Sequence, residues 1–246
     1  MQEKEYRQAE GLSQSELNTF IKSPKAYEQL KLGGLREETT AMIFGSAFHT
    51  KILEPKIFND RFVVADRRTT IGKEKAKYCE SIGQKIITDT DYQTILAMEE
   101  SLFYHPTFRT LYEQRTSVEE AMFWNETISG KNRKAKGRLD FATNDSICDL
   151  KTTDKPDLSF RYSIKDFGYH RQAAWYLDAK KDKKFFIFIA IQKKPPFDIG
   201  LYTLSDVVLD KARLEIKDAI EKLEICEELG IYPSLNGNKI TEIGEI

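Results

Sequence analysis

Cysteine is scarce in this chain, and the cysteines that are present follow no known binding pattern. The 246 residues include Cys79, Cys148 and Cys226, which lie far apart and show no C-x-x-C spacing. An odd number of widely spaced cysteines argues against a disulfide framework, a zinc ribbon and a cysteine-ligated iron–sulfur cluster. A reducing cytoplasm is therefore the expected location of the protein.

The sequence also lacks an excess of either charge and any long apolar run. It has 38 lysines and arginines against 39 aspartates and glutamates. No overall basic character predicts nucleic-acid binding, so a polyanion would have to be held by local patches. No segment approaches the roughly 20 apolar residues of a membrane helix, and the charged first residues, MQEKE, have no apolar core. We expect neither export nor membrane insertion.

The residues that are present suffice for a folded core, because 40% of the chain is hydrophobic. Periodicity and turn residues predict helices first, then an antiparallel meander of three strands, a helix, two strands and a final helix. The expected helices are 13–21 with a Ser13/Glu16 capping box, a short one from Pro24, 41–53, 73–80, 91–104, 166–179 and 206–229. The expected strands are 118–124, one that follows 131–136 and ends at 141, 147–152, 185–192 and 199–204, with a short extended piece at 58–66.

These elements predict a single α/β domain with a mixed central sheet flanked by helices and a helical N-terminal extension. Residues 1–105 are expected to be mainly helical, 106–230 to hold the sheet, and 231–246 to form a C-terminal tail. The chain shows no internal repeat that would indicate a different architecture.

The most informative stretch is GRLD at 137–140, followed nine residues later by DLKTT at 149–153. Side chains alternate along a strand, so Asp149 and Lys151 share one face while Leu150 points into the core. If the preceding strand places Asp140 beside them, two carboxylates and one ammonium group meet. A hard divalent cation with oxygen ligands is the usual answer to such crowding, so we predict a Mg²⁺ site.

A surface salt-bridge cluster is the alternative interpretation of these three charges. It is less natural on a strand that the apolar Ile147 and Leu150 bury, since buried acids near a lysine are where perturbed pKa values gather. The functional interpretation is metal-assisted phosphodiester hydrolysis. One or two ions would polarise the phosphate, and Lys151 would orient the attacking water and stabilise the developing negative charge.

Two further metal ligands are open questions at the sequence level. Either Glu119 or Glu120 can share the face of the site, and period-two alternation does not choose between them, while adjacent glutamates on an edge are often simply solvated. His49 lies inside an apolar helix, where it is either a satisfied core residue or a neutral imidazole ligand that would admit Mn²⁺ as well as Mg²⁺. We expect His105 to be structural, and His170 has no assigned role.

Other polar features carry less information alone. Gln172 and Tyr176 are four residues apart and so share one helix face. The basic segments are 67–68, 131–136, 180–184 and 193–194. Such runs are usually solvated faces, although together they would suit a phosphate backbone, which needs no base contacts.

Several sequence blocks together carry a family resemblance. They are LSQSEL at 12–17 with Ser23, Pro24 and Tyr27, FGSAFH at 44–49 running into LEP at 53–55 and Phe58, RRT at 67–69 with Gly72 and Lys73, DLKTT at 149–153, and YHRQAAWY at 169–176. From about residue 11 to 204 the chain resembles the RecE-type phage exonucleases (exonuclease VIII), relatives of lambda exonuclease in the PD-(D/E)xK nuclease superfamily. Glu119 lies five residues before Trp124, as the family's acid does before its aromatic, which favours Glu119 over Glu120.

The resemblance implies a role for each matching residue. His49, Asp140, Asp149 and the Leu150 carbonyl would bind metal, and Glu119 would complete the shell. Lys151 would act on the attacking water, while Gln172 and Tyr176 would position the lysine or the scissile strand. The implied contacts to DNA are Ser13, Ser15, Arg67, Arg68 and Arg138. Leu139 replaces the proline of the name motif, which affects only backbone geometry.

The resemblance also implies an activity and partners. The expected enzyme is a Mg²⁺-dependent 5′→3′ exonuclease, with Mn²⁺ able to substitute, that digests linear double-stranded DNA and leaves a 3′ single strand. A RecT-type single-strand annealing protein would use that strand in phage or prophage recombination, and the enzyme would be a ring-shaped trimer or tetramer.

The alternatives are a Cas4-type or RecB-type nuclease, an endonuclease, or an inactive DNA-binding module. The cysteines cannot build the cluster of the Cas4 type, and the phosphate-binding G-x-x-x-x-G-K-[ST] of a helicase-fused nuclease is absent. Retention of His49, both aspartates and Lys151 argues against an inactive module.

Overall fold

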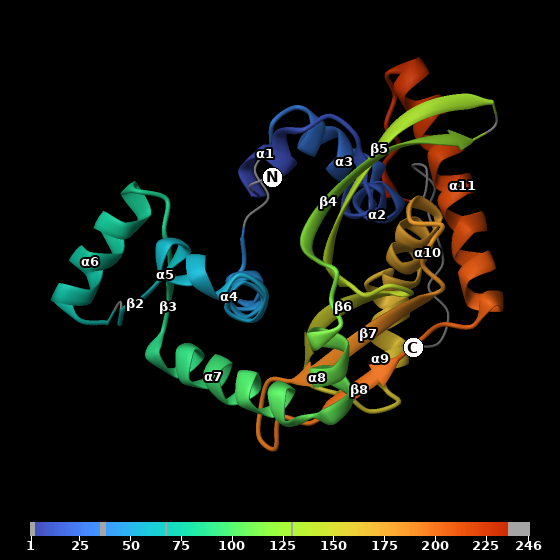
Figure 1. Ribbon diagram of the computed structural model, residues 1–246. Coiled ribbons are helices and arrows are strands. Elements are labelled where there is room, and N and C mark those ends of the chain that lie inside the picture. The colour runs from blue at the N-terminus through green and yellow to red at the C-terminus, as the bar shows by residue number, and fades with distance from the viewer. Residues whose placement is uncertain (1–2, 35–37, 67, 129, 236–246) are drawn as a thin grey trace, which may run out of the picture.

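The computed structural model describes residues 3–34, 38–66, 68–128 and 130–235 (Figure 1). The helices are α1 (Glu3–Gln8), α2 (Gln14–Lys22), α3 (Pro24–Lys31), α4 (Thr40–Leu53), α5 (Phe58–Arg61), α6 (Thr70–Ser81), α7 (Asp89–Tyr104), α8 (Pro106–Glu113), α9 (Phe160–Asp166), α10 (Tyr169–Ala179) and α11 (Asp206–Leu229), with a 3-10 turn η1 (Pro55–Ile57). The strands are β1 (Leu12–Ser13), β2 (Phe62–Val64), β3 (Lys85–Ile87), β4 (Ser117–Ile128), β5 (Lys131–Ala142), β6 (Ser146–Thr153), β7 (Phe185–Gln192) and β8 (Ile199–Tyr202).

The main sheet is mixed, as the sequence predicts. Its strand order is β1-β5-β6-β7-β8, with β4 paired to the other edge of β5. The β4–β5 and β5–β6 pairs are antiparallel and confirm the meander, whereas β6 and β7 run parallel. The short strand β1, which was not predicted, pairs in parallel with β5 at Ala135 and Lys136. The fold is therefore the α/β class expected, with helices on both faces of a mixed sheet (Figure 1).

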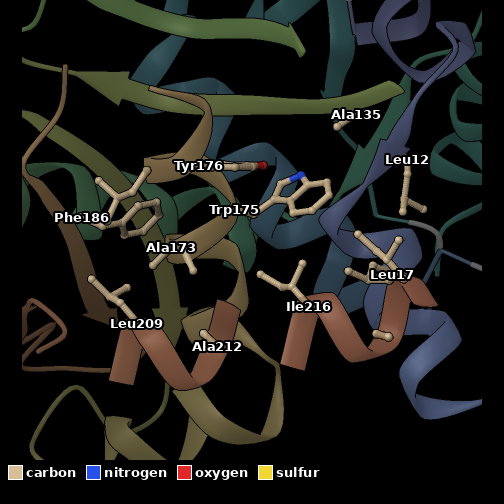
Figure 2. Packing of buried hydrophobic residues seen from close by; sticks show 14 of the residues in the cluster. Leu12, Leu17, Ala135, Ala173, Trp175, Tyr176, Phe186, Leu209, Ala212 and Ile216 are labelled. Carbon is tan, nitrogen blue, oxygen red and sulfur yellow. The ribbon is translucent and has the colours of Figure 1, made fainter. Parts of the chain in front are cut away.

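Alternating residues of the central strands divide between two hydrophobic cores. Ile147, Phe186 and Phe188 belong to the core on the side of α10 and α11. Figure 2 shows side chains of α2, α10 and α11 gathered on this face, among them Leu17, Trp175 and Ile216. On the other face, the core joins α4, α7 and α8 to residues of the strands that include Cys148, Leu150, Ile189 and Ile191. The period of two seen in the sequence thus places Asp149 and Leu150 on opposite faces.

Side chains cap the starts of several helices, and the predicted Ser13/Glu16 capping box is one of these caps. The Ser13 hydroxyl accepts the Glu16 backbone N–H at 3.3 Å, and the Glu16 carboxylate accepts the Ser13 N–H at 2.8 Å, which completes a capping box. Ser23 caps α3, whose first residue is Pro24. His105 caps the unpredicted helix α8 by accepting the Phe108 N–H, which agrees with its expected structural role.

Two predicted elements are wrong. Residues 58–66 are not one extended piece, because Phe58 to Arg61 form helix α5, and the Phe58 and Phe62 rings, four residues apart, stack 5.5 Å apart. Only 62–64 form a strand, β2, which pairs with β3 in a second sheet beside α6 (Figure 1). The helix expected over 166–179 begins only at Tyr169, as α10, because Gly168 has a φ of +70°, and the separate helix α9 that precedes this glycine was not predicted.

Gly168 offers a test of this joint. An added Cβ would lie 2.3 Å from an Arg171 side-chain nitrogen and 2.7 Å from the Asn18 Oδ1, whereas Gly83, with φ of +82°, has open space around it. Gly83→Ala should therefore cost only the left-handed strain of about 1 kcal/mol, and Gly168→Ala should cost about 2 kcal/mol or more. Urea unfolding of both variants measures the difference. Equal costs would show that the joint tolerates a side chain.

Candidate active site

A break in strand pairing creates the site. The edge of β5 that faces away from β4 is paired with β1 at Ala135 and Lys136, and with β6 only at Phe141 and Ala142. Residues 137–140, the GRLD motif, therefore have no strand partner on this side, and we call them the open edge of β5. Backbone groups on an open edge need other partners, and side chains of the site supply them.

Asp140 bridges the open edge to β6. Its Oδ2 accepts the Leu150 backbone N–H at 2.7 Å, where continued pairing would have placed a β5 carbonyl. The N–H and C=O of one strand residue point to the same side, so the Leu150 carbonyl also faces the open edge. The predicted role of this carbonyl as a metal ligand stays a prediction, but its direction is compatible with it.

His49, Glu119 and Asp140 form a compact group of ligand atoms. One atom from each lies within 4.8 Å of the other two. His49 comes from α4, and its Nδ1 is 3.3 Å from Asp140 Oδ2. Glu119 lies on β4 opposite Asp140, at the one position of the β4–β5 register with no ladder pair. Its φ of +49° re-aims the side chain into the group.

The structure distinguishes the two adjacent glutamates that alternation could not. Glu119 lies in the group, whereas Glu120 points away and its Oε1 accepts a hydrogen bond from Lys180 at 2.5 Å. A positive φ at a non-glycine residue has no sequence signal, so strand periodicity could not have located this acid. The arrangement favours Glu119 as the additional ligand.

Asp149 and Lys151 lie on the α10 side of the open edge, as alternation predicts. Lys151 Nζ is 2.6 Å from Asp149 Oδ2, and Gln172 on α10 donates a hydrogen bond to Asp149 Oδ1 at 2.8 Å. Asp149 is not a member of the compact group with His49. Its carboxylate is thus held by a cation and an amide, and Gln172 positions Asp149 rather than the lysine itself.

Tyr176 supports the open edge from the same helix. Its hydroxyl accepts the Arg138 backbone N–H at 3.4 Å, which satisfies a donor that no strand reaches. A Cβ on Gly137 would lie 2.7 Å from the Tyr176 ring, so glycine at this position of GRLD lets the ring approach the backbone. Gln172 and Tyr176, four residues apart on α10, therefore have different partners. Gln172 contacts Asp149, and Tyr176 contacts the backbone of β5.

The acids of the site are electrostatically crowded. Burial raises the pKa of Glu119 to about 7, and the nearby Asp140 charge adds to the shift. Burial also raises the pKa of Asp149 to about 6, although the Lys151 ammonium opposes it. Burial would raise the pKa of Asp140 as well, but the His49 charge and hydrogen bond outweigh it and hold that pKa low. The group is one that a bound cation would stabilise.

Arg138 lies next to Glu119 and is part of a series of ion pairs between basic and acidic side chains. Its Nε is 2.5 Å from Glu119 Oε2, and one of its terminal nitrogens is 3.7 Å from Glu54, which also accepts a hydrogen bond from Arg61 at 3.3 Å. Glu54 and Arg61 were missed by sequence reasoning. The only signal was the position of Glu54 in the LEP block, because nothing local links residue 54 to 119.

The other residues expected to contact DNA have different surroundings. Ser13 is engaged in the capping box, and its hydroxyl lies 3.1 Å from that of Ser15. The Arg68 guanidinium is exposed and paired with Asp66. Arg67 lies outside the described residues. A role of these side chains in DNA binding remains a prediction.

Basic side chains of the segment 131–136 form ion pairs with acids of the protein itself, instead of being available to a polyanion. Its side chains reach α11 and the N-terminal residues, and the pairs are Lys131 with Glu224 and Glu228, Arg133 with Glu227, and Lys134 with Glu10. Lys136 is buried and donates to the backbone carbonyl of Ala9 at 2.7 Å. The acids lie nearly a hundred residues or more from their partners, so local charge patterning could not reveal them.

His170, which the sequence left unassigned, is buried and belongs to a polar cluster that extends to the surface at Glu215. Its Nε2 is 2.9 Å from Glu215 on α11, and Arg171 contacts the same carboxylate at 2.5 Å. Arg171 Nε also donates to Asn18 of α2 at 2.9 Å. The cluster joins α2, α10 and α11 and thereby fixes the helix that carries Gln172 and Tyr176.

A family match covers most of the chain. Residues 13–239 match the family described as a PDDEXK-like domain of unknown function (DUF3799). The chain belongs to this family. The match agrees with the PD-(D/E)xK core that the sequence predicts and with the mixed sheet of the structure. No curated protein matches the chain in sequence.

One solved structure supports the same fold, and a second is only distantly similar. A protein from Eubacterium rectale, provisionally named an exonuclease, has a TM-score of 0.69 at 15% identity, covering 100% of this chain and 96% of that one. An alkaline exonuclease from Laribacter hongkongensis has a TM-score of 0.33 at 16% identity, covering 75% of this chain and 96% of that one. At such identities the first likeness establishes the fold alone, and the second is too distant to carry an argument.

A search of the described residues for membrane spans finds no helix with both the length and the apolar character required to cross a bilayer.

Cation binding at this site should depend on pH. Bound ligands are deprotonated, whereas Glu119, with a pKa of about 7, and Asp149, with a pKa of about 6, carry protons in acid. Lowering the pH from 8 to 6 should therefore weaken Mn²⁺ binding by about tenfold through protonation of Glu119 and by about a further twofold through protonation of Asp149. Calorimetric titration in two buffers of different ionisation enthalpy measures both affinity and proton release.

Matched glutamate variants provide the control for this titration. Glu119→Gln should weaken binding and reduce the number of protons released, whereas Glu120→Gln, which alters the acid paired with Lys180, should leave both unchanged. An affinity that is the same at pH 6 and pH 8 would contradict the assignment of these carboxylates.

Proposed function

We propose that this protein is a Mg²⁺-dependent nuclease that hydrolyses phosphodiester bonds of DNA. The observation that carries the proposal is the group of His49, Glu119 and Asp140 at the open edge of β5, beside the Asp149–Lys151 ion pair. Ligands for a cation and a partly buried lysine would supply the two effects that stabilise the transition state in metal-assisted hydrolysis of a phosphodiester.

The donor set fits a hard divalent cation. Two carboxylates and one imidazole converge within 4.8 Å, and the Leu150 carbonyl faces the same side. Oxygen-rich sites of this kind suit Mg²⁺, and the imidazole also admits Mn²⁺. His49, Glu119, Asp140 and Leu150 would hold one ion, and Asp149 would contribute to a second or shared position.

A bound ion at this site would polarise the phosphate and lower the pKa of an attacking water. The chain's own side chains would do the rest. The Lys151 ammonium would stabilise negative charge on the phosphate oxygens, and Asp149 would hold that ammonium in place. Gln172 would orient Asp149, and Tyr176 would keep the open edge of β5 in position. Arg138, next to Glu119, would contact the DNA backbone.

The finer activity rests on the family resemblance. We propose 5′→3′ digestion of linear double-stranded DNA from its ends, leaving a 3′ single strand for a RecT-type annealing protein in phage or prophage recombination. The name given to the Eubacterium rectale protein supports an exonuclease rather than an endonuclease. A cytoplasmic, ring-shaped trimer or tetramer is part of the same proposal.

Removal of either Lys151 or a cation ligand should abolish DNA digestion while the protein remains folded. Lys151→Ala should lower the rate of duplex digestion by about a thousandfold or more, because it removes a charge that stabilises the transition state in a buried site. Asp140→Asn should do the same and should also abolish Mn²⁺ binding, which Lys151→Ala should retain. The measurement is release of nucleotides from linear duplexes in Mg²⁺, with circular dichroism to verify folding.

The choice of DNA substrate distinguishes nuclease activity in general from 5′→3′ digestion of duplex ends. Duplexes labelled at the 5′ or the 3′ end report polarity, and a circular duplex reports internal cutting. Lys77→Ala, on the exposed face of α6, serves as the control and should digest DNA normally. A fully active Lys151→Ala protein would refute the mechanism. Early loss of the 3′ label would reverse the polarity, and cutting of the circle would indicate an endonuclease.

A further inference from the structure

Lys151 is held from two sides by different elements. On one side, Asp149 of the same strand lies 2.6 Å from its Nζ. On the other, Nζ stands over the ring of Tyr169, 4.6 Å from the ring centroid, at the first position of α10. A lysine side chain has four flexible carbons, so an ammonium group that must act at one point needs both its distance and its direction fixed.

The Tyr169 ring is itself firmly placed. Its centroid lies 6.1 Å from that of Phe160, 5.6 Å from that of Phe167 and 6.0 Å from that of Phe188. These rings come from α9, the α9–α10 joint and β7. The positive φ of Gly168 starts α10 at this point and so directs the ring toward Lys151. A ring packed in this way cannot follow a mobile lysine; it fixes the lysine instead.

From this geometry we infer that Tyr169 is a positioning residue for Lys151, acting through the face of its aromatic ring. The negative face of the ring attracts the ammonium group electrostatically. In the described part of the chain the Tyr169 hydroxyl makes no hydrogen bond, so the ring rather than the hydroxyl carries the role. The inference rests on the proposed function, in which Lys151 acts on the scissile phosphate.

The contact of Lys151 with the Tyr169 ring does not depend on the charges of the other site residues. Asp149 is also held by Gln172 and is a candidate cation ligand, so its negative charge is shared among several partners. An aromatic face is neither titrated nor drawn toward a metal ion, and it stays beside Lys151 when the charges around Asp149 change. Asp149 and the Tyr169 ring together therefore hold the Lys151 ammonium group in position throughout the reaction, which the carboxylate alone would not do.

Ring electronics can be changed without changing ring shape. Tyr169→Phe should retain the wild-type rate. Replacing residue 169 by phenylalanines with one, two, three and five ring fluorines progressively removes the negative face. We expect kcat on linear duplex DNA to fall stepwise, by about tenfold in total, while KM stays within about twofold. A role in packing alone would not produce a graded loss in kcat at constant shape.

The matched control is Tyr162 on α9, an exposed tyrosine whose ring lies beneath Arg161 rather than Lys151. The same fluorinated residues at position 162 should leave kcat unchanged. Tyr169→Leu, which removes the ring, should reduce kcat at least as much as the most fluorinated ring. No dependence on fluorination at residue 169, or an equal dependence at residue 162, would overturn the inference.

A second readout does not need activity. In the metal-free protein, nuclear magnetic resonance of ¹³C-labelled lysine should show the terminal methylene of Lys151 shifted upfield by the ring current of Tyr169, with Lys151→Arg identifying the signal. The shift should persist in Tyr169→Phe and vanish in Tyr169→Leu. If the wild type digests no DNA, the proposed function fails. An unshifted Lys151 signal in the wild type would refute the contact itself.

Discussion

The structure depends on one hydrogen bond, which the Leu150 backbone N–H donates to Asp140 at the place where β5 and β6 separate. Strand pairing would have satisfied both backbones there, and its loss leaves donors and acceptors that must find partners. Asp140 and Tyr176 supply them on β6 and β5 respectively. The same separation admits His49 from one face of the sheet and leaves Asp149 and Lys151 beside the open edge on the other. The site is the consequence of an interrupted sheet.

The charges at the open edge are balanced only in part. Two cations, Lys151 and Arg138, face the acids Glu119, Asp140 and Asp149, and His49 adds a charge when protonated. Burial makes each uncompensated carboxylate costly, which is why protons remain on Glu119 and Asp149 at higher pH than usual. A site arranged in this way gains more from a divalent cation than a solvated acidic cluster would.

Sequence reasoning predicted the parts that obey local rules. The capping box at Ser13, the meander and the helix 206–229 follow from caps and periodicity, and each is found. What failed depended on backbone conformation or distant partners. The φ of Gly168 makes α10 begin three residues later than periodicity predicts, and the φ of Glu119 brings this acid, which only the family resemblance favoured, into the group. The pairing of 131–136 with α11 and the contact of Tyr169 with Lys151 required the tertiary structure.

The central proposal is that the open edge of β5 binds a divalent cation through His49, Glu119, Asp140 and the Leu150 carbonyl. Anomalous diffraction from crystals soaked in Mn²⁺ tests it most directly, because the ion and its ligands are then located without reference to activity. We predict one strong peak within about 2.3 Å of an atom from each of these residues. The absence of a peak there, or a peak only at exposed acids elsewhere, would contradict the account.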